Sequence, residues 1–119
     1  MTKEFADKFA KEWIEAWNSH DLDKILSHYS EDFSIETPMA LKLFPESKGL
    51  VEGKSNVRKY WAAGIQRIPN LKFEILDLLI GVNGLTIYYV NTATNRRSVE
   101  VMNFNGDNKV NKAIVNYSE

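Results

Sequence analysis

The sequence predicts an α+β fold in which a curved, mixed or antiparallel β-sheet wraps around N-terminal helices. Three observations lead to this prediction: an aromatic helical stripe near the N-terminus, a short strand after it, and hairpin-linked strands filling the C-terminal half. Helices that are segregated along the chain from antiparallel strands are typical of α+β proteins. A sheet that curls around helices too small to fill it would leave a cone-shaped cavity.

The composition limits the class of protein. A length of 119 residues fits one domain over residues 1–119 with a single core. A net charge of -1 without a basic run argues against nucleic-acid and anionic-membrane partners. The absence of cysteine excludes disulfides and thiolate chemistry. The charged, helical N-terminus does not resemble a signal peptide, so we expect a cytoplasmic protein without a membrane partner.

The first element is an amphipathic helix. Phe5, Phe9, Trp13 and Trp17 recur every four residues, with lysines and glutamates on the opposite side. Thr2 is a suitable N-cap. An aromatic face of this width needs a broad apolar partner, which favours a sheet over a second helix.

The next segments are shorter. A second helix is predicted from an Asp21 cap to about Tyr29, followed by a strand over residues 33–36 that Pro38 stops. Residues 39–53 are expected to be irregular. Because this segment is apolar, it should cover a pocket mouth or contact a second subunit.

A third helix and the sheet complete the chain. Ser55 or Asn56 can cap the helix, which Pro69 ends. Asn83-Gly84 predicts a tight hairpin turn. The strands are expected at residues 71–80, 85–93, 96–104 and 109–117.

Four features together resemble a known superfamily. They are AWNSHDLDKILSHYSEDFSIETP at residues 16–38, GKSNVRKYW at 53–61, the three-strand meander, and VMNFNGDNKV at 101–110. The chain resembles the nuclear transport factor 2-like superfamily, and within it the SnoaL-like group, over almost its whole length. The resemblance implies a cystatin-like curved sheet around a conical apolar pocket, commonly in a homodimer. Members include isomerases, polyketide cyclases, dehydratases and non-catalytic binding domains, so the fold leaves the activity open.

The ketosteroid isomerase pattern within this superfamily matches only in part. Its general-base aspartate falls on Thr37, which cannot accept a proton near neutral pH, and the adjacent Glu36 should point to the opposite face. Its oxyanion tyrosine falls on Trp13. Its partner acid falls on Glu100, so the resemblance assigns this residue an acidic role.

Glu100 is the best candidate for proton transfer. Strand alternation allows it to face inward with Met102 and Phe104, or outward if Val99 and Val101 face the core. The resemblance favours the inward phase. Burial would then raise the pKa of the Glu100 carboxyl and suit it to general acid or base catalysis.

Further residues are candidates for the pocket wall. The resemblance places Tyr89 and Asn91 in the cone, although a strand-end asparagine also commonly bonds to backbone. Tyr29 and Tyr60 could offer phenols to a ligand or edge the core, and the tryptophans could serve both roles. The residues predicted to line the pocket are Trp13, Trp17, Tyr29, Thr37, Tyr60, Trp61, Tyr89, Asn91, Met102 and Phe104.

Three functions remain open from the sequence. The first is binding of an apolar small molecule without chemistry. The second is a cofactor-independent isomerase, cyclase or dehydratase that uses Glu100. The third is a dimerising interaction module that uses the outer sheet face and residues 39–44. His20 and His28 do not have metal-ligand spacing, so we expect neither a metal nor a cofactor.

Overall fold

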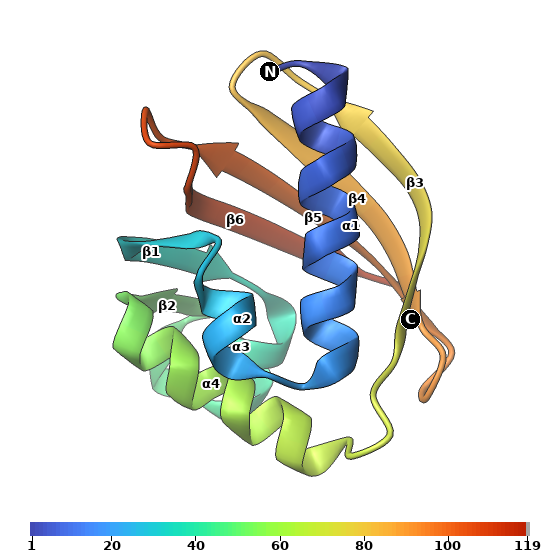
Figure 1. Cartoon of the computed structure of the whole chain (residues 1–119). Helices are drawn as coiled ribbons and strands as arrows, with labels where there is room; N and C mark the ends of the chain where they lie inside the picture. Colours follow the sequence, from blue (N-terminus) through green and yellow to red (C-terminus); the bar gives the residue numbers. More distant parts are fainter. Residues whose placement is uncertain (119) are drawn as a thin grey trace.

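A computed structural model describes residues 1–118 and contains one six-stranded sheet with helices on its concave side (Figure 1). The helices are α1 (Lys3–Ser19), α2 (Leu22–Leu26), α3 (Pro38–Leu43), the short 3-10 helix η1 (Pro45–Ser47) and α4 (Lys54–Arg67). The strands are β1 (Tyr29–Glu36), β2 (Leu50–Glu52), β3 (Phe73–Ile80), β4 (Gly84–Asn91), β5 (Arg96–Phe104) and β6 (Val110–Tyr117).

The sheet has the strand order β2-β1-β6-β5-β4-β3. β1 and β6 run parallel, whereas every other neighbouring pair is antiparallel. α1 packs against β3, and α4 packs against β1. This arrangement confirms the predicted α+β fold with a mixed sheet. No helix within residues 1–118 combines the length and apolar character needed to cross a membrane.

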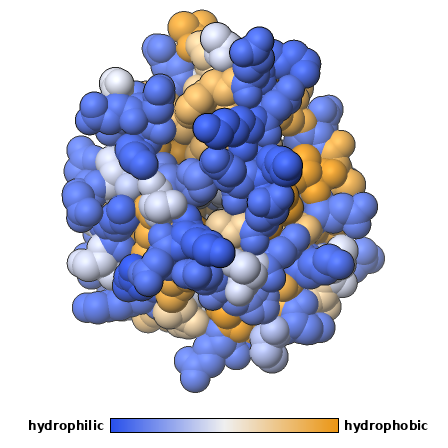
Figure 2. Space-filling model, viewed as in Figure 1, coloured by the Kyte–Doolittle hydropathy of each residue, from blue (hydrophilic) through white to orange (hydrophobic). Residues whose placement is uncertain are grey.

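The aromatic stripe of α1 meets the sheet, as its width predicts. The rings of Phe9 and Phe104 meet edge to face with centroids 4.9 Å apart, and those of Trp13 and Tyr89 with centroids 5.2 Å apart. Thr2 caps the helix as predicted. The outward side of the helical layer is mostly hydrophilic (Figure 2), so α1 separates a polar surface from an aromatic core.

The predicted extent of the second helix is wrong. α2 ends at Leu26, and Tyr29 begins β1 instead of closing the helix. The backbone N–H of Val110 donates a 2.9 Å hydrogen bond to the carbonyl of His28, which draws the chain into the sheet beside β6. Tyr29 is therefore a strand residue and is only 2% exposed.

Residues 39–53 contain helices and a strand, so the prediction of an irregular loop is wrong. The hydroxyl of Thr37 accepts a hydrogen bond from the backbone N–H of Met39, and Pro38 occupies the first turn, so the segment starts a helix. β2 then returns antiparallel to β1, with Ile35 opposite Val51. Met39, Leu43 and Val51 pack against the core, whereas Leu41, Phe44 and Leu50 stay exposed.

Two glycines determine the start of α4 and the close approach of β4 to β5. Gly53, with φ +87°, is the N-cap of α4 in place of Ser55 or Asn56. The hairpin between β3 and β4 forms as predicted, but Gly84 lies in the strand instead of the turn, and its φ is not positive. A Cβ atom there would collide with the carbonyl oxygen of Met102, so β4 needs glycine to lie this close to β5.

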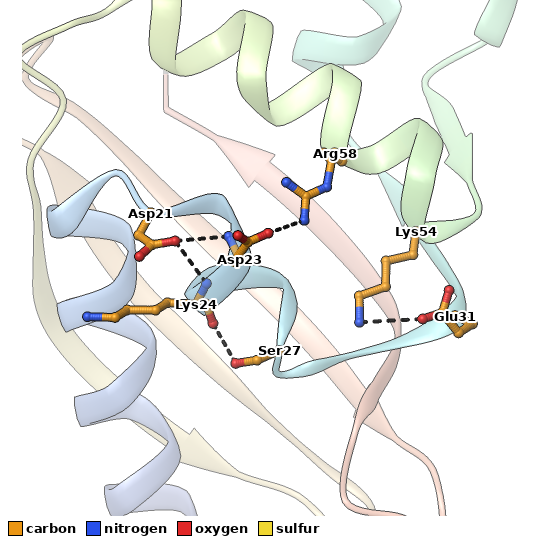
Figure 3. A network of polar contacts seen from close by, with 7 residues as sticks. All are labelled: Asp21, Asp23, Lys24, Ser27, Glu31, Lys54 and Arg58. Atoms are coloured by element: carbon orange, nitrogen blue, oxygen red, sulfur yellow. Dashed lines mark hydrogen bonds and ion pairs between the residues drawn. The ribbon is translucent and has the colours of Figure 1, made fainter.

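Exposed ion pairs connect α2 and β1 to α4 (Figure 3). Arg58 on α4 pairs with Asp23 on α2, and Lys54 pairs with Glu31 on β1 at 3.8 Å. Surface pairs of this kind contribute about 0–1 kcal/mol each. Their contribution to the stability of the fold is therefore small.

Candidate functional site

A cavity of about 390 Å³ lies between the helices and the concave face of the sheet. Its wall is formed by residues of α1, α3 and α4 together with β1, β3, β4, β5 and β6. The volume falls within the range of roughly 300–1,000 Å³ that is usual for small-molecule sites. The wall is mainly aromatic and aliphatic, with a few polar groups at defined places.

Glu100 is one of these polar groups, because β5 takes the inward phase. Ser98, Glu100 and Met102 are buried, whereas Val101 between them is 46% exposed. Glu100 is 4% exposed and lines the cavity. The phenol of Tyr89 on β4 donates a 2.7 Å hydrogen bond to its Oε2 atom.

The environment of Glu100 favours its neutral form. Burial raises the pKa of the carboxyl from its ordinary value of 4.5 to about 7, and the hydrogen bond from Tyr89 partly offsets that rise. Burial, together with the charge of Glu100, raises the pKa of Tyr89 well above its usual value. Glu100 can therefore gain or lose a proton near neutral pH, while Tyr89 remains a hydrogen-bond donor.

A second polar group lies where β1 ends. The hydroxyl of Thr37 donates a 3.1 Å hydrogen bond to the phenol oxygen of Tyr117 on β6, and Tyr60 of α4 lines the same part of the cavity. Burial and the neighbouring Tyr117 raise the pKa of Tyr60. Glu36 is exposed on the other face, as alternation predicts. This group is neutral and offers hydroxyls instead of a base.

The structure brings most of the predicted pocket residues together. Those that line the cavity with Glu100 are Trp17, Thr37, Tyr60, Trp61, Tyr89 and Asn91. The Oδ1 atom of Asn91 also accepts a 3.0 Å hydrogen bond from the backbone N–H of Ala93, so this side chain serves the turn as well as the wall.

Four predicted wall residues lie in the solid core instead. The indole N–H of Trp13 donates a 3.0 Å hydrogen bond to the Tyr29 hydroxyl, and these two buried side chains satisfy each other. Met102 and Phe104 follow Glu100 along β5 and are both buried. At this end of the strand, the ring of Phe9 on α1 packs against the ring of Phe104. The cavity therefore stops at about Glu100.

Several wall residues were not predicted. Arg96 and Ser98 share the inward face of β5 with Glu100, and Tyr117 is opposite Ser98 on β6. Extending the inward phase of Glu100 by two and four residues toward the start of the strand would have found the first two. Lys42 and Arg67 also line the cavity, and their sequence positions carry no comparable signal.

Both histidines contact other parts of the fold. The Nε2 atom of His20 lies 2.7 Å from the carbonyl oxygen of Leu71, and the His28 ring packs against Phe9. Within residues 1–118, histidine and acidic side chains do not form a group of three or more that could hold a metal ion.

Comparison with known proteins identifies the family. The family model of the SnoaL-like domain matches residues 10–113. The chain belongs to the SnoaL-like domain family. Curated proteins gave no match to the sequence.

Solved structures of SnoaL-like and related proteins share the fold. A SnoaL-like protein of unknown function from Burkholderia thailandensis E264 is 39% identical over 100% of this chain and 99% of that chain, with a TM-score of 0.94. An NTF2-like protein of unknown function from Burkholderia xenovorans LB400 is 18% identical over 98% and 85%, with a TM-score of 0.76. A member of the SnoaL-like family from Agrobacterium tumefaciens C58, proposed to be an isomerase, is 13% identical over 98% and 99%, with a TM-score of 0.75.

Proposed function

We propose that this SnoaL-like protein binds a small, largely apolar molecule in the cavity between the helices and the sheet. The observation that carries the proposal is the position of the buried pair formed by Glu100 and Tyr89, which places a carboxyl group in a mainly aromatic and aliphatic wall. Burying a polar group costs free energy, and small-molecule pockets use a few such groups to fix the orientation of the ligand. We expect the ligand to place a carbonyl or hydroxyl group beside Glu100.

Blocking the cavity should abolish ligand binding without unfolding the protein. Gly64 of α4 lines the cavity, and a Cβ atom there would have no heavy atom within 4 Å. Gly64→Phe should therefore fill the space, and binding of a panel of apolar ketones and alcohols, measured by native mass spectrometry and calorimetry, should be lost.

Gly64→Ala is the matched control for this experiment. It should keep ligand binding and stabilise α4 by roughly 0.5–1 kcal/mol, because alanine favours a helix over glycine. Ligand affinity that is equal in Gly64→Phe and in the wild type would contradict binding in this cavity, provided that circular dichroism shows both proteins folded.

A second candidate function is proton transfer on the bound molecule. It is favoured by the pKa of about 7 at Glu100, which allows this group to act as base and then as acid at neutral pH. The base position of the isomerases is occupied by Thr37, which takes part in a helix cap and a hydrogen bond to Tyr117. Any proton abstraction would therefore depend on Glu100.

We also propose that two copies associate through the outer face of the sheet. Cross-strand pairing places Leu79, Thr86, Val101 and Ile114 in one row across four strands, and Leu79 is 56% exposed. Leu79 and Val101 are the exposed apolar residues of the row, and exposed apolar patches commonly mark protein interfaces. A copy of the same face would cover the row.

A charge in the middle of this row should weaken the dimer. Val101→Lys is expected to raise the dimer dissociation constant by about tenfold or more, measured by analytical ultracentrifugation, because a buried ammonium loses its hydration. Val82→Lys is the control, since Val82 is 83% exposed in the β3–β4 turn. A monomeric wild-type protein at high concentration would contradict the proposal.

A further inference from the structure

We infer that the cavity selects an amphipathic anion, whose apolar body lies inside and whose carboxylate lies at the cavity mouth. This inference rests on the proposed binding function and adds the chemical class of the ligand. Three cationic side chains carry it: Lys42 on α3, Arg67 on α4 and Arg96 on β5. All three line the cavity and are exposed to solvent.

The charge of these three side chains is not neutralised within the described chain. Ion pairs among residues 1–118 join Lys3 to Asp7, Lys54 to Glu31, and Arg58 to Asp23. The sole carboxylate among the described lining residues is the buried Glu100. Three separate elements therefore direct positive charge to one opening, and an anion entering there would meet no competing surface carboxylate from the wall.

Arg96 is held at this opening by an aromatic ring. Its guanidinium carbon lies 5.3 Å from the centre of the Tyr117 ring, which itself lines the cavity. A cation over an aromatic face is attracted by the electrons of the ring. This contact leaves the planar donors of the guanidinium available for bidentate bonding to a carboxylate.

The inward face of β5 changes character from the mouth to the closed end. Arg96 lies opposite Asn91 on β4 at the mouth, Ser98 lies opposite Tyr89 one layer deeper, and Glu100 follows in the third layer. Beyond it, the wall gives way to the solid core. The strand thus presents a cation, a hydroxyl and then a buried acid along one path.

The length of this path restricts the ligand. Four residues of extended strand span roughly 13 Å between the Cα positions of Arg96 and Glu100. An anionic group beside Glu100 would lose its hydration in an apolar environment and would repel the ionised form of Glu100, whereas at the mouth it meets three cations. The ligand should therefore carry its acid at one end and a neutral oxygen or a hydrocarbon group at the other.

Matched acid and amide pairs test this inference. The probes are dodecanoate with dodecanamide, and 1-naphthylacetate with 1-naphthylacetamide, measured by isothermal titration calorimetry at pH 7. We expect the wild-type protein to prefer at least one acid over its amide by roughly tenfold, since several exposed charge contacts of modest strength add up to this size. Raising the salt concentration from 50 to 500 mM should reduce the preference severalfold.

Neutralising the mouth should remove the preference and leave amide binding unchanged. The variant for this purpose combines Lys42→Met, Arg67→Gln and Arg96→Gln. The control has the same net charge and combines Lys8→Met, Lys59→Gln and Arg97→Gln, all exposed and outside the cavity wall. The control should retain the preference of the wild type.

The outcomes separate the inference from the function on which it rests. Amides that bind as tightly as the acids, or a preference for acids that survives in the cavity-mouth variant, would overturn the anion inference alone. Failure of all four probes to bind would count against ligand binding in the cavity and hence against both. If the cavity-mouth variant fails to fold, the salt dependence of the wild-type protein still tests whether the cavity prefers an anion.

Discussion

Glu100→Gln is expected to stabilise the protein at pH 8 and to flatten the dependence of its stability on pH. The folded protein holds the Glu100 proton up to a pKa of about 7, whereas the carboxyl in the unfolded chain has its ordinary value of 4.5. Between these values the folded state binds more protons than the unfolded state. The free energy of unfolding must therefore fall as the pH rises through this window.

The size of the loss of stability follows from the shift in the pKa of Glu100. The rise in pKa from 4.5 to about 7 corresponds to roughly 3 kcal/mol of stability, present below pH 4.5 and lost above pH 7. Glutamine is close in shape, remains neutral at every pH, and can accept the hydrogen bond that Tyr89 donates to Oε2. The free energy of unfolding of the variant should therefore not fall with pH as that of the wild type does.

Urea unfolding at several values between pH 4.5 and pH 8.5 measures this prediction directly. Glu36→Gln is the control, because it removes an exposed carboxylate at the end of β1. The control should follow the wild-type curve closely. If Glu100→Gln loses stability with pH as steeply as the wild type does, the carboxyl is not the buried titrating group.

Glu100→Gln is also expected to slow proton exchange on a bound ketone by a large factor. In the wild type, the Glu100 carboxylate would take a proton from the carbon beside the carbonyl and leave an enolate. The proton on Glu100 would exchange with solvent D₂O, and Glu100 would then return a deuteron to the same carbon. General acid–base groups typically contribute about 10²–10⁴-fold to such rates. We expect a loss of at least the lower value.

Proton NMR of 2-tetralone and cyclic enones in D₂O follows this exchange. The wild-type rate should rise with pH to a plateau above the pKa of about 7 of Glu100, since the carboxylate is the active form. Glu36→Gln should retain the full rate. Catalysed exchange that persists in Glu100→Gln, or a wild-type rate no higher than that of buffer, would argue against proton transfer and leave ligand binding as the function.

Local patterns were sufficient for the fold and for part of the site. The four-residue aromatic spacing of α1 predicted a helix on a sheet, and β5 was predicted with the bounds that the structure shows. The choice between the two phases of β5 needed the resemblance to SnoaL-like proteins. Once Glu100 faces inward, alternation alone also places Ser98 and Arg96 in the wall.

Contacts between distant segments account for the failures. The stretch around Tyr29 fits a helix locally, but pairing with β6 makes it a strand. Residues 39–53 lack a strong period, and β2 forms because the edge of β1 is available to it. The sequence predicts that Trp13 serves both the core and the wall, whereas its hydrogen bond to Tyr29 holds it in the core.

The parallel pairing of β1 with β6 has a consequence for how the protein folds. Ile35 lies beside Ala113, so nearly the whole chain must be available before these two strands can meet. Contacts between residues so far apart in sequence slow folding, because a long loop must close first. The β3–β6 meander can form earlier from local hairpins. The docking of β1, β2 and α4 should then be the late step, and that step also closes the cavity.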